Sequence, residues 1–149
     1  MNGYLIDTNI ISMLAPTKKV LSQSFVDWLK QAEGDELLFL SVVTLHEIER
    51  GIERLQLKGA TAKAAELRGW LERVLASYAD KILPVDHATA ALSGKLEARA
   101  IGGGGNPGIS DALIAGTAQR RGLVVITENS RDFAMFGISY LSPSELAST

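Results

Sequence analysis

The chain has 149 residues, of which 46% are hydrophobic and 21% charged, a balance typical of a globular domain that buries its own core. It contains no cysteine, which excludes disulfides, thiolate metal sites and a cysteine nucleophile, and which favours the cytoplasm. The net charge of −2 lacks the basic excess with which proteins neutralise nucleic-acid phosphates, unless a bound divalent cation supplies positive charge at the site.

Residues 1–149 are expected to form one domain with no membrane partner. No internal repeat or long linker divides the sequence. No apolar run approaches the roughly 20 residues that cross a bilayer, and the first residues lack the basic and apolar regions of a signal peptide.

Apolar runs of strand length alternate with stretches of helical periodicity. Strands are expected at residues 4–6, 37–43, 82–85, 123–126 and 138–141. Helices are expected at residues 10–14, around 25–29, from 44 to 54, at 61–79, after the capping residue Asp86, and at 110–121 before Gly122, with Lys18 and Lys19 in the connection after Pro16. Continuous apolar strands are usually covered on both faces, and helices between them supply right-handed crossovers. The sequence therefore predicts an α/β fold with a mainly parallel sheet between two layers of helices.

Polar residues follow the predicted strands. Asp7 comes directly after the first strand, Glu47 lies in the first helical turn after the second, and Asp111 opens the helix before the fourth. Asn129 follows that fourth strand, and Asp132 comes three residues later. Ligands of an open parallel sheet bind outside the carboxyl ends of its strands. We therefore expect Asp7, Glu47, Asp111 and Asn129 to meet there.

Each of these residues also has a purely structural interpretation. Asp7 and Asn129 suit helix caps, and residues 44–47 have the pattern of a capping box in which Glu47 reaches back to a backbone amide. Asp111 suits a first helical turn because its charge complements the helix dipole.

Taken together, the acids indicate a cation site. Three carboxylates at one sheet edge repel one another and raise one another's pKa unless a cation neutralises them. Carboxylate oxygens without histidine or thiolate partners select a hard ion, Mg²⁺ or Mn²⁺. Such an ion lowers the pKa of a bound water and neutralises charge on phosphate, so the chemistry that fits best is phosphodiester hydrolysis.

The sequence around these residues resembles the PIN-domain family, and within it the VapC and FitB toxins of toxin–antitoxin operons. The resemblance runs from Tyr4 to about Leu141 and is carried by four motifs, at residues 4–9, 44–51, 109–115 and 125–133. It implies a PIN-like three-layer α/β/α sandwich and an acidic triad of Asp7, Glu47 and Asp111 that holds Mg²⁺ or Mn²⁺. It also implies an RNA substrate, Thr8 and Asn9 as supports for the first acid, a homodimer, and a cognate antitoxin that blocks the site.

The fourth motif departs from the family pattern. Many relatives carry Asp where Asn129 stands, and often a basic residue where Glu128 stands. Asn129 adds no negative charge, but it can coordinate through its carbonyl oxygen or orient a water. Asp132 is an alternative to it, although a cap or a backbone contact explains Asp132 more simply.

The resulting hypothesis is a toxin ribonuclease in which Asp7 and Asp111 hold the ion and Glu47 orients or deprotonates the attacking water. Two other functions stay open: a PIN module that binds RNA or protein without catalysis, and a phosphatase of the haloacid dehalogenase type. The phosphatase needs a second carboxylate two residues after the first, where this chain has Asn9.

Three further groups of residues have alternative explanations. His46 and His87 could act as a metal-free acid–base pair, but the aligned acids explain more of the sequence. A solvated helix face accounts for Arg50, Arg54 and Lys58 more readily than an RNA contact does. The aromatic residues Trp28, Trp70 and Tyr78 fit the core or a subunit contact.

Overall fold

The computed structural model describes residues 2–16 and 21–147, so the expected connection with Lys18 and Lys19 lies outside the described residues. The strands are β1 (Tyr4–Ile6), β2 (Leu38–Ser41), β3 (Ile82–Leu83), β4 (Val124–Ile126) and β5 (Tyr140–Leu141). The helices are α1 (Thr8–Met13), α2 (Gln23–Gly34), α3 (Val42–Leu57), α4 (Thr61–Ser77), α5 (His87–Gly102), α6 (Ile109–Arg121), α7 (Ser130–Phe136) and α8 (Pro143–Ala147). In the part of the chain described, no helix is long and apolar enough to cross a membrane.

The five strands form one sheet in the order β3-β2-β1-β4-β5, and every pair is parallel. From β1 the chain builds outward through β2 to β3, then returns to place β4 and β5 on the other side of β1. The direction of winding therefore changes between β1 and β4, and such a switch point opens a crevice at the carboxyl ends of the two strands. Asp7 follows β1 directly and Asn129 follows β4, so both lie at this crevice.

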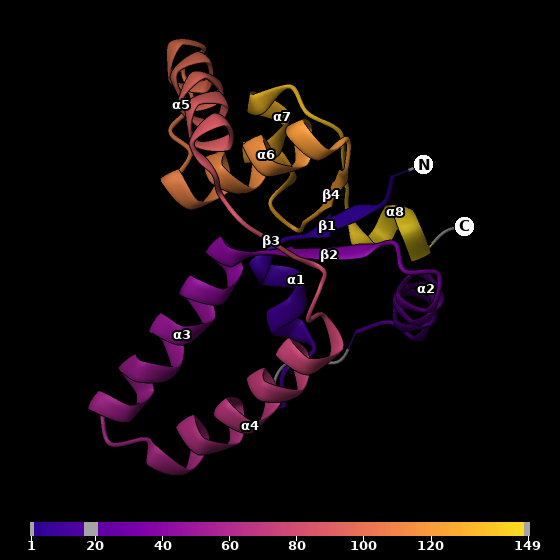
Figure 1. Cartoon of the computed structure of the whole chain (residues 1–149), viewed down its shortest axis with the longest axis vertical. Coiled ribbons are helices and arrows are strands. Elements are labelled where there is room, and N and C mark those ends of the chain that lie inside the picture. The colour runs from indigo at the N-terminus through magenta and orange to yellow at the C-terminus, as the bar shows by residue number, and fades with distance from the viewer. Residues whose placement is uncertain (1, 17–20, 148–149) are drawn as a thin grey trace.

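Helices cover both faces of the sheet, which confirms the predicted α/β/α layers (Figure 1). Figure 1 shows α5, α6 and α7 above the strands and α3 and α4 below them. Successive strand residues point to opposite faces: Leu5 belongs to the core cluster that contains Ile114 of α6, whereas Ile6 belongs to the one that contains Ile10 of α1. Because both faces are buried, the strands are continuously apolar.

The second strand is shorter than predicted, and the following helix begins earlier. Ser41 ends β2 and caps α3, because its hydroxyl oxygen accepts a hydrogen bond of 3.0 Å from the Val43 amide. Thr44 therefore lies inside the helix, and the predicted capping box at residues 44–47 is wrong. The β-branched run from Val42 to Thr44 favours a strand by propensity, but the cap at Ser41 starts the helix before it.

Other predicted helix ends are confirmed. The Asp86 carboxylate caps α5 by accepting a 2.8 Å hydrogen bond from the Thr89 amide. Gly122 ends α6 with φ of 66°, a left-handed conformation that glycine adopts without the steric penalty of a Cβ. Of the three aromatic residues expected in the core or a subunit contact, Trp70 and Tyr78 are buried in the core and Trp28 packs partly buried against it.

Two helical glycines should respond oppositely to replacement by alanine. A Cβ at Gly116 would overlap the Ser93 hydroxyl and lie 3.1 Å from the Ser93 Cα, so Gly116→Ala should destabilise the packing of α6 on α5 by about 1–3 kcal/mol. A Cβ at Gly51 of α3 meets no atom within 4 Å, so Gly51→Ala should stabilise the protein by about 0.4–1 kcal/mol. Urea denaturation of both variants checks this, and a loss of stability in Gly51→Ala would contradict it.

Candidate active site

The central acid of the site is Asp7, which is 3% exposed and joins the two strands of the switch point. Its backbone amide donates to the Ile126 carbonyl at 3.0 Å. Its Oδ1 accepts a hydrogen bond from the Thr8 amide at 2.8 Å, and its Oδ2 accepts one from the Thr127 hydroxyl at 2.7 Å. Both carboxylate oxygens therefore have donors, one from α1 and one from the end of β4.

Thr127 is a site residue that the sequence reasoning missed. Its side chain is fully buried, and its hydroxyl oxygen also accepts a 2.8 Å hydrogen bond from the Asn129 amide. A signal for it does exist in the sequence. Thr127 is the first polar residue after β4, as Asp7 is after β1, and the register pairs Ile6 with Ile126.

The second acid, Glu47, lies in α3 and is held by α1. Its Oε1 accepts a hydrogen bond from the Thr8 hydroxyl at 2.6 Å, and the same hydroxyl lies 2.9 Å from the hydroxyl of the buried Thr44. A carboxylate can only accept, so the Thr8 proton points to Glu47, and the Thr44 hydroxyl can donate to Thr8. Glu47 thus contacts a side chain across the site, and not the backbone amide that a capping box requires.

The third acid, Asp111, meets Asp132 through Asn129. One nitrogen, Asn129 Nδ2, donates to Asp111 Oδ2 at 2.8 Å and to Asp132 Oδ2 at 2.9 Å. Asn129 stands at the cap position of α7, but its side chain makes no capping hydrogen bond. The structural interpretation of Asn129 as a side-chain cap is therefore wrong, because this amide bridges two carboxylates.

The charges of the acids act on one another. The pKa of Asp111 is raised to about 6. Burial is the largest cause, the negative charges of Asp7, Asp132 and Glu47 add to the rise, and the hydrogen bond from Asn129 opposes it. Burial also raises the pKa of Asp7, against the hydrogen bonds from Thr127 and Thr8, and the charge of Glu47 adds to the rise. The structure thus brings Asp7 and Glu47 close enough for their charges to act on Asp111.

The donor set of this site suits a hard divalent cation. Within residues 2–16 and 21–147, no three His, Asp or Glu side chains are arranged to ligate one ion as they stand. Each of Glu47, Asp111 and Asp132 has its recorded hydrogen bonds on a single carboxylate oxygen. The other oxygen of each, together with Asn129 Oδ1, is of the kind that Mg²⁺ and Mn²⁺ prefer, and a cation would relieve the repulsion among the acids.

The structure does not favour the phosphatase hypothesis or the metal-free histidine pair. Asn9 Oδ1 accepts a hydrogen bond from the Glu128 amide at 3.3 Å, so this position connects two loops and carries no second carboxylate for a phosphatase. His46 and His87 are exposed on α3 and α5, and no hydrogen bond or ion pair within the described ranges joins either to the acids.

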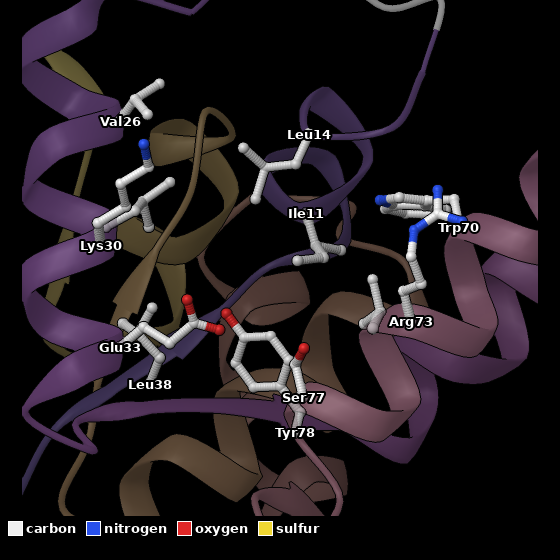
Figure 2. Close-up of a pocket in the computed structure, with 12 residues that line it drawn as sticks. Ile11, Leu14, Val26, Lys30, Glu33, Leu38, Trp70, Arg73, Ser77 and Tyr78 are labelled. Carbon is white, nitrogen blue, oxygen red and sulfur yellow. The ribbon is translucent and has the colours of Figure 1, made fainter.

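Two cavities flank α1. One, of about 260 Å³, lies between α1, α3 and α4 and reaches the site at Thr8 and Glu47. The other, of about 270 Å³, lies between α1, α2 and α4 and contains none of the site acids. Figure 2 shows the apolar side chains of this second cavity and the Glu33 carboxylate beside the Tyr78 hydroxyl. Burial, with the charge of Glu33, raises the pKa of Tyr78 to about 12, so the Tyr78 hydroxyl stays protonated at neutral pH.

The PIN domain matches residues 4–137, so the chain belongs to the PIN-domain family. It is 29% identical to the toxin FitB of Neisseria gonorrhoeae over 93% of this chain and 96% of that protein. It is also 29% identical to the tRNA(fMet)-specific endonuclease VapC of Shigella flexneri, over 92% of this chain and 94% of that one.

Solved structures agree with this assignment. The crystal structure of FitAcB from Neisseria gonorrhoeae matches with a TM-score of 0.79 and 29% identity, over 95% of this chain and 98% of that one. The crystal structure of VapBC-5 from Mycobacterium tuberculosis, a member of the VapBC family of toxin–antitoxin systems, matches with a TM-score of 0.62 and 26% identity, over 95% of this chain and 98% of that one.

The acid site should make the metal-free protein less stable as the pH rises. The pKa of Asp111 is about 6 in the folded chain against 3.8 ordinarily, so the folded state binds more protons between these values and its free energy of unfolding falls as they are released. The raised pKa of Asp7 acts in the same direction. Urea denaturation in EDTA from pH about 4 to about 7 should show this decline.

Asp111→Asn should flatten that decline and raise stability at neutral pH. The matched control is Asp80→Asn, which changes an exposed acid before β3, at the opposite end of the strands. An equal slope in Asp111→Asn and the control would contradict the assignment of the decline to this site.

Proposed function

We propose that this PIN-domain protein is a Mg²⁺- or Mn²⁺-dependent endoribonuclease and the toxin of a type II, VapBC-like toxin–antitoxin system. The observation that supports the proposal most strongly is the convergence of Asp7, Glu47 and Asp111 on one sheet edge, where the charges of Asp7 and Glu47 help to raise the pKa of Asp111. The relatives named as a toxin and as an endonuclease cover nearly the whole chain and support the same function.

In this proposal each residue of the site has a separate role. Asp7 and Asp111 hold the divalent ion, which when bound supplies positive charge beside the phosphate and makes water more acidic. Glu47 orients the attacking water or takes its proton, and its place in α3 is fixed by the Thr8 hydroxyl. Thr127 holds the Asp7 carboxylate in position. Asn129 holds Asp111 against Asp132.

The proposed partners follow the same relatives. RNA is the substrate, a cognate antitoxin blocks the site, and the toxin is a cytoplasmic homodimer. Two solved structures support an antitoxin partner, that of FitAcB and that of a VapBC toxin–antitoxin system. In each of them, this chain covers 98% of the chain that it resembles.

Purified protein should cleave RNA with Mg²⁺ or Mn²⁺ and lose this activity in excess EDTA. Asp7→Asn should abolish cleavage, because it removes a buried ligand charge, while thermal denaturation should show an intact fold. Asp80→Asn, which removes the same charge from an exposed position, should keep full activity. Direct attack by water should leave no 2′,3′-cyclic phosphate on the products.

Two results would overturn the nuclease proposal. One is unchanged RNA cleavage by Asp7→Asn or in excess EDTA. The other is binding of RNA or of a protein partner without any metal-dependent cleavage, which would support the non-catalytic PIN module instead.

Asn129→Ala should raise the Mg²⁺ concentration needed for half-maximal cleavage by about 10–100-fold, as expected when a group that orients a metal ligand is lost. The physical reason is that the Asn129 amide is the recorded donor shared by Asp111 and Asp132. The control is Asn106→Ala, which changes an exposed asparagine in the loop before α6. If Asn129→Ala keeps the Mg²⁺ dependence of the parent, the Asn129 bridge between Asp111 and Asp132 does not support metal binding.

A further inference from the structure

Helix α3 and its C-cap residue carry a row of cations that starts beside the active site. Its members, Arg50, Arg54 and Lys58, are called the basic stripe here. At about 100° per residue, Arg54 and Lys58 fall within about 20° of the direction of Glu47, and Arg50 within about 60°. Lys58 lies about 16 Å along the helix axis from Glu47, at 1.5 Å per residue. Figure 1 shows α3 running away from the sheet, so the stripe leads outward from the site.

The cations of the basic stripe are exposed and have no recorded partner. Within the described ranges, no hydrogen bond or ion pair involves any of the three. The nearby Glu49 is already taken, since both of its carboxylate oxygens lie 2.7 Å from Arg68 Nη1. Glu53 points about 100° away from Arg54, and within the described residues it forms no ion pair with Arg50, three residues before it. The positive charge of the stripe therefore faces solvent.

A cavity lies beside the basic stripe, and a fourth cation lines it. The cavity of about 260 Å³ that reaches Thr8 and Glu47 is also lined by Gly51 and by Lys63 of α4. Lys63 stands in the first turn of α4, where the helix dipole disfavours a positive charge, so the helix itself gives no reason for it. Gly51, between Glu47 and Arg54, has open space around it, which lets a polymer approach the helix backbone.

We propose that the basic stripe is the track that holds the phosphate backbone of a single RNA strand beside the active site. The inference rests on the proposed nuclease function and adds where the substrate runs. Cations that repeat every four residues, the first of them one helical turn beyond Glu47, fit a polyanion that passes through the site. Backbone contacts of this kind position a nucleic acid without reading its sequence. An overall charge of −2 is compatible with them, because these three exposed cations lie close together on one side of α3.

The test compares two double variants with the same change in charge. Arg54→Gln/Lys58→Gln removes two cations of the stripe. Lys95→Gln/Arg99→Gln removes two exposed cations, also four residues apart, from the solvent-facing side of α5. Each is made in the Asp7→Asn background, and binding of a fluorescent single-stranded RNA is followed by anisotropy in Mg²⁺, with KCl between about 50 and about 200 mM.

The stripe variant should bind RNA more weakly, and the slope of log affinity against log salt should fall by about 1.4, since each phosphate contact to a single strand contributes about 0.7. The control variant should keep the slope of the parent. With Asp7 restored, the stripe variant should raise KM for RNA and leave kcat unchanged. Equal slopes for the two double variants would overturn the proposal. So would unchanged RNA affinity with lost binding of an acidic protein partner.

This experiment separates the track from the nuclease. If the wild-type protein cleaves RNA and the stripe variant binds it like the control, only the track is wrong. If the wild-type protein does not cleave RNA but the slope falls in the stripe variant alone, the track stands and the nuclease proposal is wrong.

Discussion

Repulsion among carboxylates is the constraint around which this site is built. Asp111 and Asp132 both contact one nitrogen of Asn129, so the contacting oxygens lie within about 6 Å of each other. Two unit charges at that distance repel by about 3 kcal/mol at an effective dielectric constant of 20. A hydrogen bond to a charged group contributes about 1.5–3 kcal/mol, so the two bonds from Asn129 offset this repulsion. The repulsion from Asp7 and Glu47 is not offset in this way, and it contributes to the raised pKa of Asp111.

This balance gives a physical reason for asparagine at position 129. A carboxylate there would add a negative charge beside Asp111 and Asp132 and would remove the donor that both accept from. An amide supplies that donor and keeps its own oxygen available. Asn129 and Asp132, three residues apart, therefore act as one unit beside Asp111. In the proposed site, Asp132 carries the negative charge that Asn129 lacks.

The sequence was sufficient to predict the sheet, its parallel strands and the edge at which the acids meet, because apolar runs mark buried strands and Asp7 directly follows one. It was not sufficient for the contacts between distant segments. Thr127 and Asp7 are 120 positions apart, and their hydrogen bond depends on the register of β1 against β4. The alternative interpretation of Glu47 as part of a capping box fails for a related reason. Its pattern with Thr44 matches a capping box, and only the fold shows that Thr8 is its donor.

The acids of the site and an RNA backbone are both negatively charged, so they repel each other. How far each cation of the basic stripe lies from the acids decides whether it offsets this repulsion. At physiological salt, exposed charges are largely screened beyond about 8 Å. Arg50 lies about 4.5 Å from Glu47 along the axis of α3, so its charge acts on the same phosphate that the carboxylates repel. Lys58, about 16 Å away along the axis, is screened from the acids and acts only on phosphates farther along the strand. Under the proposed track, Arg50 therefore offsets repulsion at the site, whereas Arg54 and Lys58 add affinity outside it.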